Sequence, residues 1–271
     1  MLARAALAST ALLAASTAVS AQSTSAGDLL SGVSNQCIQA VSSLALGSDF
    51  ATCSSFSSLL TLATTSGSVI DPINSWLENL CSQEDCSDAA IQNATAVINQ
   101  GCADSTSAIV TTGRSVVANF NQVKEGLCLQ YTSNSTFCVT DLLTNLQTAL
   151  GQDLSISSLT DLDTSSLTSV PSSAVCTDCT HGLVTKLSSA LESDSTVSSN
   201  NGTITDALAS YCGDSFTDGE VPDSVREASG NSTNNSNVTS QPLNGASIAT
   251  AGVWKVAGGA LLGVAGLVAL A

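Results

Sequence analysis

The stretch IVTTGRSVVANFNQVKEGL, residues 109–127, decides which fold the chain is expected to adopt. Its apolar side chains recur at a spacing of about 3.6 residues, which is one turn of an α-helix. The stretch therefore predicts one long helix that turns a single apolar face toward a core. The members of that face are Ile109, Val110, Val116, Val117, Phe120, Val123 and Leu127.

The same period occurs on both sides of this stretch. Before it, Asp71-Pro72 is typical of a helix N-cap followed by proline at the first helical position. Strands are not expected, because regular apolar–polar alternation and an Asn-Gly turn between apolar strands are missing. We therefore predict one all-α domain over residues 27–213. Its other apolar helix faces are Ile73, Trp76, Leu77 and Leu80; Ile91, Ala94 and Ile98; Leu142, Leu143, Leu146 and Leu150; and Leu183, Val184, Leu187 and Leu191.

Ten cysteines, an even number, lie inside this helical region. Such a set is typical of a disulfide framework formed in an oxidising, secretory compartment. The spacing leaves the connectivity open. The predicted disulfide cysteines are Cys37, Cys53, Cys81, Cys86, Cys102, Cys128, Cys138, Cys176, Cys179 and Cys212.

The order of the cysteines favours a divergent duplication into two helical units. Five cysteines precede residue 110 and five follow it, and each set contains a close pair, at 81–86 and at 176–179. Chance similarity between serine- and leucine-rich helices is the open alternative. Because five is odd, full oxidation requires at least one disulfide between the two halves.

Cys176-Thr177-Asp178-Cys179 is the motif most suggestive of chemistry. Such a pair can be redox-active, or it can bind zinc together with His181, the only histidine. However, the βαβ context of a redox pair is missing, and oxidation would consume the thiolates of a zinc site. We interpret both cysteines as structural disulfide positions, and we predict no metal site and no cofactor.

No catalytic residue is predicted. Any Ser-His-Asp or Cys-His arrangement would have to use His181, for which a surface or capping role is favoured, and no G-x-S-x-G motif accompanies it. A carboxylate pair for glycoside hydrolysis stays open, since such a pair is recognised only in a folded structure. With two Trp and two Tyr, the chain has few aromatic platforms for sugars, and we expect a protein that is not an enzyme.

The N-terminal segment MLARAALASTALLAASTAVSA joins one early cation, Arg4, to a run rich in alanine and leucine. It ends in Val19-Ser20-Ala21, with small residues where signal peptidase reads them. Residues 1–21 are therefore predicted to be a cleaved signal peptide. Six Asn-x-Ser/Thr sequons in the remaining chain then predict exposed N-glycosylation sites at Asn93, Asn134, Asn201, Asn231, Asn234 and Asn237.

The C-terminal region is predicted to hold a stalk and an anchor signal. Residues 214–244 are rich in Ser, Thr, Asn and Gly, so we expect a flexible, glycosylated stalk. Asn244-Gly245-Ala246, a spacer over 247–255 and an apolar run over 256–271 match a glycosylphosphatidylinositol (GPI) signal. Attachment is predicted at Asn244, with 245–271 removed. Ser229-Gly230-Asn231 is a fallback site, and a short transmembrane anchor is the weaker alternative because the apolar run is short for a bilayer.

This layout resembles an uncharacterised fungal family of secreted, cysteine-containing, GPI-anchored cell-surface proteins. The resemblance covers roughly Cys37 to Cys212, and it implies no activity and no catalytic residues. The resembling motifs are Cys81-x4-Cys86, Leu127-Cys128-Leu129, Phe137-Cys138-Val139-Thr140 and Cys176-x2-Cys179.

Taken together, these features predict a GPI-anchored glycoprotein on the outer face of the plasma membrane or in the cell wall, with a structural or surface-interaction role. The expected partners are the membrane, through the GPI lipid, and cell-wall glucan. The formal net charge of −16 argues against nucleic acid as a partner. The alternative is a binding module that holds a lipid or sterol in a helical cavity, and the sequence does not identify a protein or lipid partner.

Overall fold

The computed structural model describes residues 33–63, 65, 67–105, 108–155, 158, 170–191 and 208–228. Within them the chain is mostly helical, which confirms the all-α prediction. The predicted signal peptide, the GPI attachment residue Asn244 and four of the sequons lie outside the described residues. Those sequons are Asn201, Asn231, Asn234 and Asn237.

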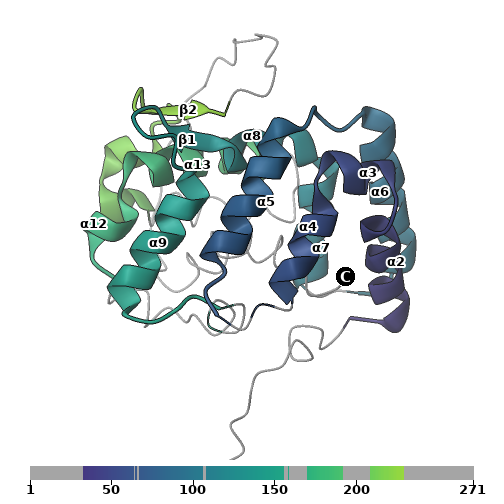
Figure 1. Cartoon of the computed structure of the whole chain (residues 1–271). Helices are drawn as coiled ribbons and strands as arrows, with labels where there is room; N and C mark the ends of the chain where they lie inside the picture. The colour runs from purple at the N-terminus through teal and green to yellow at the C-terminus, as the bar shows by residue number, and fades with distance from the viewer. Residues whose placement is uncertain are drawn as a thin grey trace, which may run out of the picture.

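Three helices lie side by side in a row: α4 (Phe56–Ala63), α5 (Ile70–Ser82) and α9 (Cys138–Leu150) (Figure 1). At one end of the row, α2 (Asn35–Ala45) packs against α6 (Asp88–Gly101), and α3 (Asp49–Cys53) contacts both. At the other end, α12 (Ser172–Val175) contacts α9. The other helices of the described residues are α7 (Ala108–Ala118), α8 (Phe120–Leu127) and α13 (Asp178–Leu191), and the 3-10 turn η1 (Asp214–Thr217) follows them.

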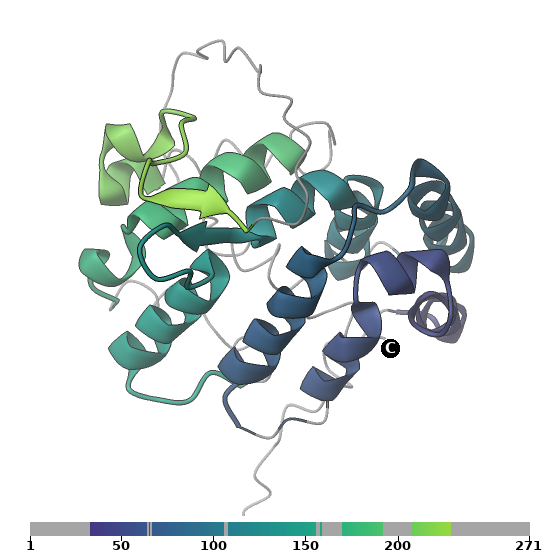
Figure 2. The ribbon, with the colours of Figure 1, turned by 45° about the horizontal axis from the view of Figure 1, so that its top comes forward.

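Two short strands are the exception to the helical fold. β1 (Leu129–Tyr131) and β2 (Val225–Glu227) pair antiparallel, with Gln130 opposite Arg226. Figure 2 shows this pair lying over α9 and α13, and both strands contact α13. The sheet therefore joins the middle of the chain to the end of its described part.

Serine side chains begin several of these helices. Ser34 accepts a hydrogen bond from the Cys37 N–H at the start of α2, and Ser48 accepts one from Ala51 at the start of α3. Ser87 does the same for α6, whose first residue is Asp88. Such caps satisfy N–H groups that have no partner inside the helix, and an acidic first turn complements the helix dipole. These three serines therefore help to define where α2, α3 and α6 begin.

Two predicted helix boundaries were wrong. The stretch 109–127 is not one helix, because α7 ends at Ala118 and α8 begins at Phe120. Asn119 adopts φ −111° and ψ 28° between them, and its side-chain amide donates to the Ser115 carbonyl. The helix α5 begins at Ile70 and not after Asp71, because the Val69 N–H donates to the Leu154 carbonyl and Val69 is buried at the helix entry.

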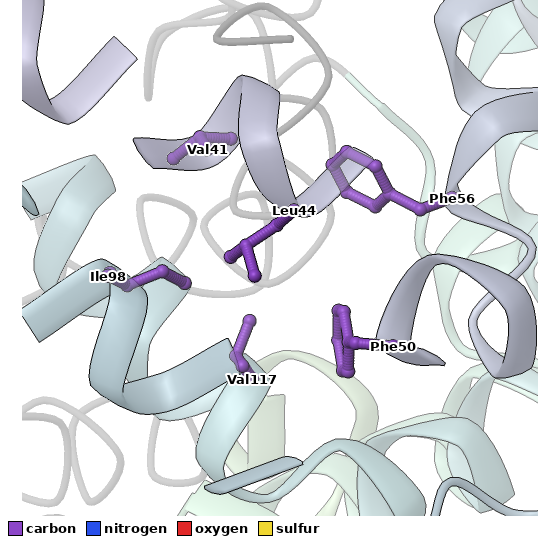
Figure 3. Close-up of a pocket in the computed structure, with 6 residues that line it drawn as sticks. All are labelled: Val41, Leu44, Phe50, Phe56, Ile98 and Val117. Carbon is purple, nitrogen blue, oxygen red and sulfur yellow. The ribbon is translucent and has the colours of Figure 1, made fainter. Parts of the chain in front are cut away.

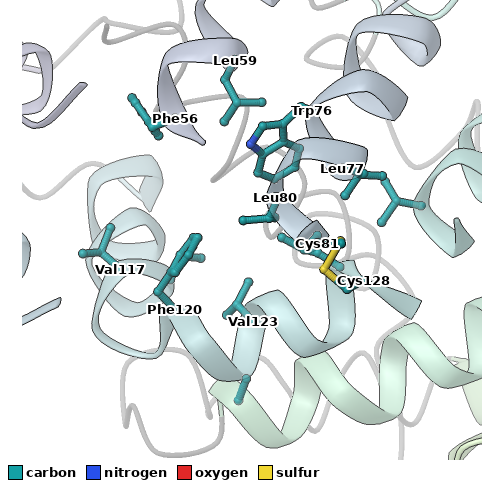
Figure 4. Close-up of a cluster of buried hydrophobic side chains, with 14 of the residues drawn as sticks. Phe56, Leu59, Trp76, Leu77, Leu80, Cys81, Val117, Phe120, Val123 and Cys128 are labelled. Carbon is teal, nitrogen blue, oxygen red and sulfur yellow. A yellow bond between two sulfur atoms is a disulfide. The ribbon is translucent and has the colours of Figure 1, made fainter. Parts of the chain in front are cut away.

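One hydrophobic core runs through the described body, from Cys37 of α2 to Val225 of β2, and Figure 4 shows the part of it where α5 packs against α8. Leu77 and Leu80 of α5 are fully buried, and Phe120 and Val123 supply the facing side chains from α8. Trp76 is also buried, and its indole N–H donates to the Ser54 carbonyl over 3.1 Å. The apolar face predicted from the sequence period is thus the face that packs, although the helix that carries it is broken in two.

The contact between α2 and α6 depends on Gly101. A Cβ atom there would lie 2.2 Å from the Cβ of Ala40, so the helices can approach this closely only with glycine. We expect Gly101→Ala to lower the free energy of unfolding by about 1–3 kcal/mol, as overpacking of a core does. Thermal or urea unfolding under non-reducing conditions measures the change.

Two matched variants test this explanation. Gly67→Ala adds the same methyl group where no atom lies within 4 Å, and its stability should stay close to that of the wild type. Ala40→Gly combined with Gly101→Ala should recover part of the loss, because it removes the colliding Cβ. An equal loss in the single and the double variant would contradict the close-contact explanation.

All ten cysteines are paired. The disulfides are Cys37–Cys102, Cys53–Cys86, Cys81–Cys128, Cys138–Cys179 and Cys176–Cys212. One disulfide, Cys81–Cys128, joins the two halves, as expected from the odd number of cysteines in each. It links the end of α5 to the residue that follows α8.

The connectivity contains a repeated crossed pattern. The first set of four is Cys53, Cys81, Cys86 and Cys128. In this set the first cysteine pairs with the third, and the second pairs with the fourth. The four from Cys138 to Cys212 pair in the same way. This pattern favours the predicted duplication and keeps the match between the close pairs 81–86 and 176–179. It does not keep the division into five and five cysteines, because Cys128 matches Cys212 and the Cys37–Cys102 bridge has no counterpart.

The predicted start of the stalk at residue 214 is wrong. Residues 214–228 pack on the helical body, where Phe216 and Val225 are buried and β2 pairs with β1. The composition of this segment is polar, but its few apolar side chains fall where they can be buried, and the strand pairing satisfies its backbone. The folded body therefore extends to Ala228 at least.

Candidate functional site

The structure places His181 in the first turn of α13, with its side chain 12% exposed. Its Nε2 atom lies 3.0 Å from a carboxylate oxygen of Asp218, and its ring stacks on Phe216 with 5.1 Å between the ring centres. The same oxygen of Asp218 accepts the Glu220 N–H. His181 therefore contacts Phe216 of η1 with one ring face, and Asp218, the residue after η1, with its ring edge.

Further polar contacts fasten this segment to α13. Asp178 accepts a hydrogen bond of 2.6 Å from the Ser224 hydroxyl, and the Thr185 hydroxyl donates to the Glu220 carbonyl over 3.3 Å. These bonds lie on both sides of the His181–Asp218 pair along the helix. We name residues Gly213–Ser224, which contact α13 in this way, the C-terminal strap.

A second cluster of polar side chains lies between the starts of α9 and α13, beside the Cys138–Cys179 disulfide. Its members are Tyr131, Asp141, Asn145 and Thr177. Burial raises the pKa of the Asp141 carboxyl, although hydrogen bonds from Asn145 and Tyr131 oppose that rise. Burial also raises the pKa of the Tyr131 phenol, against a hydrogen bond with Thr177, and the charge of Asp141 adds to the increase. This cluster therefore links the start of α9 to the start of α13.

Lys186 forms ion pairs with two glutamates from different elements of the fold. Its ammonium lies 3.0 Å from Glu125 of α8 and 2.8 Å from Glu227 of β2. Burial lowers the pKa of Lys186, but hydrogen bonds and charges from Glu227 and Glu125 outweigh burial and raise it. One cation therefore ties α13 to a helix and to a strand.

This ion-pair contact predicts a pH-dependent difference in stability. A raised pKa in the folded state means that Lys186 stabilises the fold below its ordinary pKa of 10.5 and that this contribution is lost as pH rises through the folded pKa. We expect Lys186→Met to lower the free energy of unfolding by about 1 kcal/mol at pH 7, and by less at pH 11.5, above the ordinary lysine pKa. Urea unfolding of both proteins at the two pH values measures it, and an equal deficit at both would contradict the assignment.

A buried lysine holds the loop between α5 and α6. Lys124 is 8% exposed, and its ammonium donates to the Gln83 carbonyl over 2.8 Å and to Asp85 over 3.1 Å. One turn earlier, the Asn121 side chain makes two hydrogen bonds with the backbone of Cys86, of 3.0 and 2.9 Å. Polar groups on α8 thus fix the loop that carries Cys86 and its disulfide to Cys53.

The chemistry that these groups can perform is limited. Within the described residues, the only side-chain hydrogen bond of His181 is the one with Asp218, and no hydroxyl or thiol donates to its ring. A general base must lie within hydrogen-bond reach of the group it deprotonates. In the described part of the chain there is also no group of three or more metal-binding side chains. The polar contacts of His181, Asp178 and Thr185 fasten the strap to α13.

The cavity between α2, α3, α6 and α7 is small and apolar (Figure 3). Its volume is about 10 Å³, which is near the space of a single water molecule. Ligand pockets typically measure several hundred Å³. Its lining consists of Val41, Leu44, Phe50, Phe56, Ile98 and Val117.

The structure places the predicted site residues as follows. Asn93 on α6 and Asn134 in the turn after β1 are both exposed, as N-glycosylation requires. Cys176 and Cys179 lie three residues apart but belong to different disulfides. Among the described residues, no helix has the length and apolar character needed to cross a bilayer.

Sequence reasoning missed the polar groups that hold the strap and the strand β2 that follows it. Asp218, Ser224 and Glu227 were assigned to a flexible stalk because they lie in a polar stretch. Their partners His181, Asp178 and Lys186 lie 37, 46 and 41 residues away in the sequence. The apolar residues Phe216, Val221 and Val225 within the stretch were the available signal that it packs.

The fold, the complete pairing of the cysteines and the strap define a disulfide-reinforced, mostly helical domain. More particularly, the chain belongs to the family of the Domain of unknown function (DUF7729), whose family model matches residues 22–221. The match covers most of the chain, and it ends within the strap. No curated protein and no solved structure gives a significant match.

Proposed function

We propose that this protein is a GPI-anchored glycoprotein of the outer cell surface or cell wall, with a non-catalytic structural or surface-interaction role. The observation that carries the proposal is the pairing of all ten cysteines, because disulfide frameworks form and persist in oxidising compartments. The signal-peptide and GPI patterns in the sequence agree with that compartment.

The charge distribution supports a role on a surface shared by many copies. The described part of the chain has four Lys and Arg residues, and each of them, Arg114, Lys124, Lys186 and Arg226, donates to a group within the fold. The charge that faces solvent is therefore mainly acidic. Such a surface keeps neighbouring copies apart and repels nucleic acid.

The glycosylation pattern is consistent with the same role. Asn134 is exposed, and its side-chain oxygen accepts the Thr136 N–H, which holds the sequon in a tight turn at the surface. Asn93 lies on the exposed side of α6, whereas Ala94 beside it is buried. Glycans at these two residues would extend into solvent without disturbing the core.

To test the proposal, the full-length chain, including its N-terminal and C-terminal signals, is expressed in a eukaryotic host that secretes it. Phosphatidylinositol-specific phospholipase C should release the protein from intact cells, or β-glucanase should release it if the anchor has been transferred to wall glucan. Mass spectrometry should find the mature chain without residues 256–271. A mature protein that keeps residues 256–271, or that neither enzyme releases, would overturn the proposal.

The alternative, a module that binds a lipid or sterol, has less support. The apolar cavity of about 10 Å³ is far smaller than such a ligand, so binding there would require α2 and α3 to move apart. Native mass spectrometry of the secreted protein tests it, since a co-purifying lipid would favour this alternative over the structural role.

A further inference from the structure

The five disulfides differ in how well the protein shields them. In four of them at least one cysteine is buried, and in three of these both are. Cys176 and Cys212 are both partly exposed. Because thiol–disulfide exchange requires a thiolate to reach a sulfur atom, this bridge is the most accessible to attack.

The Cys176–Cys212 bridge also lies outside the main core. It packs in a separate small cluster, in which Leu208 and Phe216 are buried against Val184 and the two cysteines. Few apolar contacts hold the segment that carries Cys212, and regions with few such contacts open locally at low cost. Local opening would expose both sulfur atoms further.

The other bridge with an exposed cysteine is protected in a different way. Cys53 is partly exposed, but its partner Cys86 is 3% exposed, and the Asn121 side chain holds the backbone of Cys86 by two hydrogen bonds. Lys124 anchors the same loop. Attack on this bridge would have to displace a buried cysteine from a loop that stays fixed.

We propose that Cys176–Cys212 is a thiol-exchange site, which small thiols reduce before any other disulfide of the protein. A thiolate attacks one sulfur, forms a mixed disulfide and displaces the other cysteine as a thiolate. A second thiol then attacks the mixed disulfide, releasing the second cysteine and the oxidised reductant. Two thiols supply the two electrons, and each cysteine thiolate takes a proton from water.

Reduction would release a defined part of the chain. Residues 208–216 lose their covalent link to Cys176, which lies between α12 and α13. They keep the contacts of the small cluster, the stacking of Phe216 on His181 and the hydrogen bond from the Tyr211 hydroxyl to the Val170 carbonyl. The strand β2 is held independently, because it pairs with β1 and Glu227 binds Lys186. The predicted consequence is local loosening of 208–216 while 224–228 stays in place, whether or not the protein carries a GPI anchor.

Partial reduction tests the proposal on the folded, full-length protein. Dithiothreitol is added at neutral pH without denaturant, and the free thiols are alkylated at intervals with iodoacetamide of natural isotope composition. The remaining disulfides are then fully reduced, and their cysteines are alkylated with isotope-labelled iodoacetamide. We expect Cys176 and Cys212 to be labelled together, at least about tenfold faster than the other eight cysteines. Earlier labelling of Cys53 and Cys86, or simultaneous labelling of all ten, would overturn the proposal.

The double variant Cys176→Ser with Cys212→Ser tests the structural consequence. Hydrogen exchange should become faster at residues 208–216, to the extent seen in the partly reduced wild type, while 224–228 keeps its protection. Unchanged exchange at 208–216 in the reduced wild type and in the variant would contradict the release. If the variant does not fold, the labelling of the wild-type protein still decides the order of reduction.

Discussion

Replacing Cys81 and Cys128 together by alanine should lower the free energy of unfolding by about 4 kcal/mol. This disulfide closes a loop with a sequence separation of 47 residues, and it alone among the five joins the first five cysteines to the last five. Figure 4 shows it beside Leu80 and Val123, so its loss also leaves a gap in the packed core. Removing a link of this length gives the unfolded chain many more conformations.

Urea unfolding under non-reducing conditions, followed by circular dichroism, measures this effect. The matched control is the Cys176→Ser, Cys212→Ser variant, whose disulfide has a sequence separation of 36 residues. Loop entropy alone would make the two losses nearly equal. Because the control bridge lies at the periphery, we expect the main transition to move much less in the control. A loss below about 1 kcal/mol for the first variant would show that the two halves do not depend on their covalent link.

Leu80→Ala should cost about 3–4 kcal/mol of unfolding free energy. The side chain is fully buried on α5, among Trp76, Phe120 and Val123. Truncation removes apolar burial and leaves a cavity, because the bridge at the neighbouring residue Cys81 prevents the helix from moving inward.

Leu46→Ala is the control for this prediction. It deletes the same atoms from a side chain that is 73% exposed, and its stability should stay within about 0.5 kcal/mol of the wild type. Thermal or urea unfolding of both variants compares a buried and an exposed leucine directly. Similar losses at the two positions would mean that α5 does not form the centre of the core.

The helices could be predicted from the sequence because burial follows the helical period. Val116, Val117, Phe120, Val123 and Leu127 were assigned to one apolar face, and all five are buried. The break between α7 and α8 could not be read from the same pattern, since the apolar positions continue across it. It depends on Asn119, whose amide bonds back to Ser115 and whose backbone leaves the helical conformation.

The contacts of the strap and of β2 could not be predicted from the sequence, for a different reason. His181 with Asp218 and Lys186 with Glu227 are pairs of common polar residues, and nothing in their local sequence marks one as the partner of the other. Their pairing depends on the three-dimensional path that brings β2 alongside β1. The general role assigned to Cys176 and Cys179, positions in structural disulfides, was confirmed, while their partners required the structure.

Disulfide mapping of the secreted, unreduced protein tests the central claim most directly. Free thiols are blocked, the protein is digested without reduction, and the linked peptides are identified by mass spectrometry. The structure requires no free thiol and five linked pairs, including a Cys81–Cys128 peptide that joins the two halves and separate partners for Cys176 and Cys179. Free cysteines in the secreted protein, or a Cys176–Cys179 disulfide, would contradict the account.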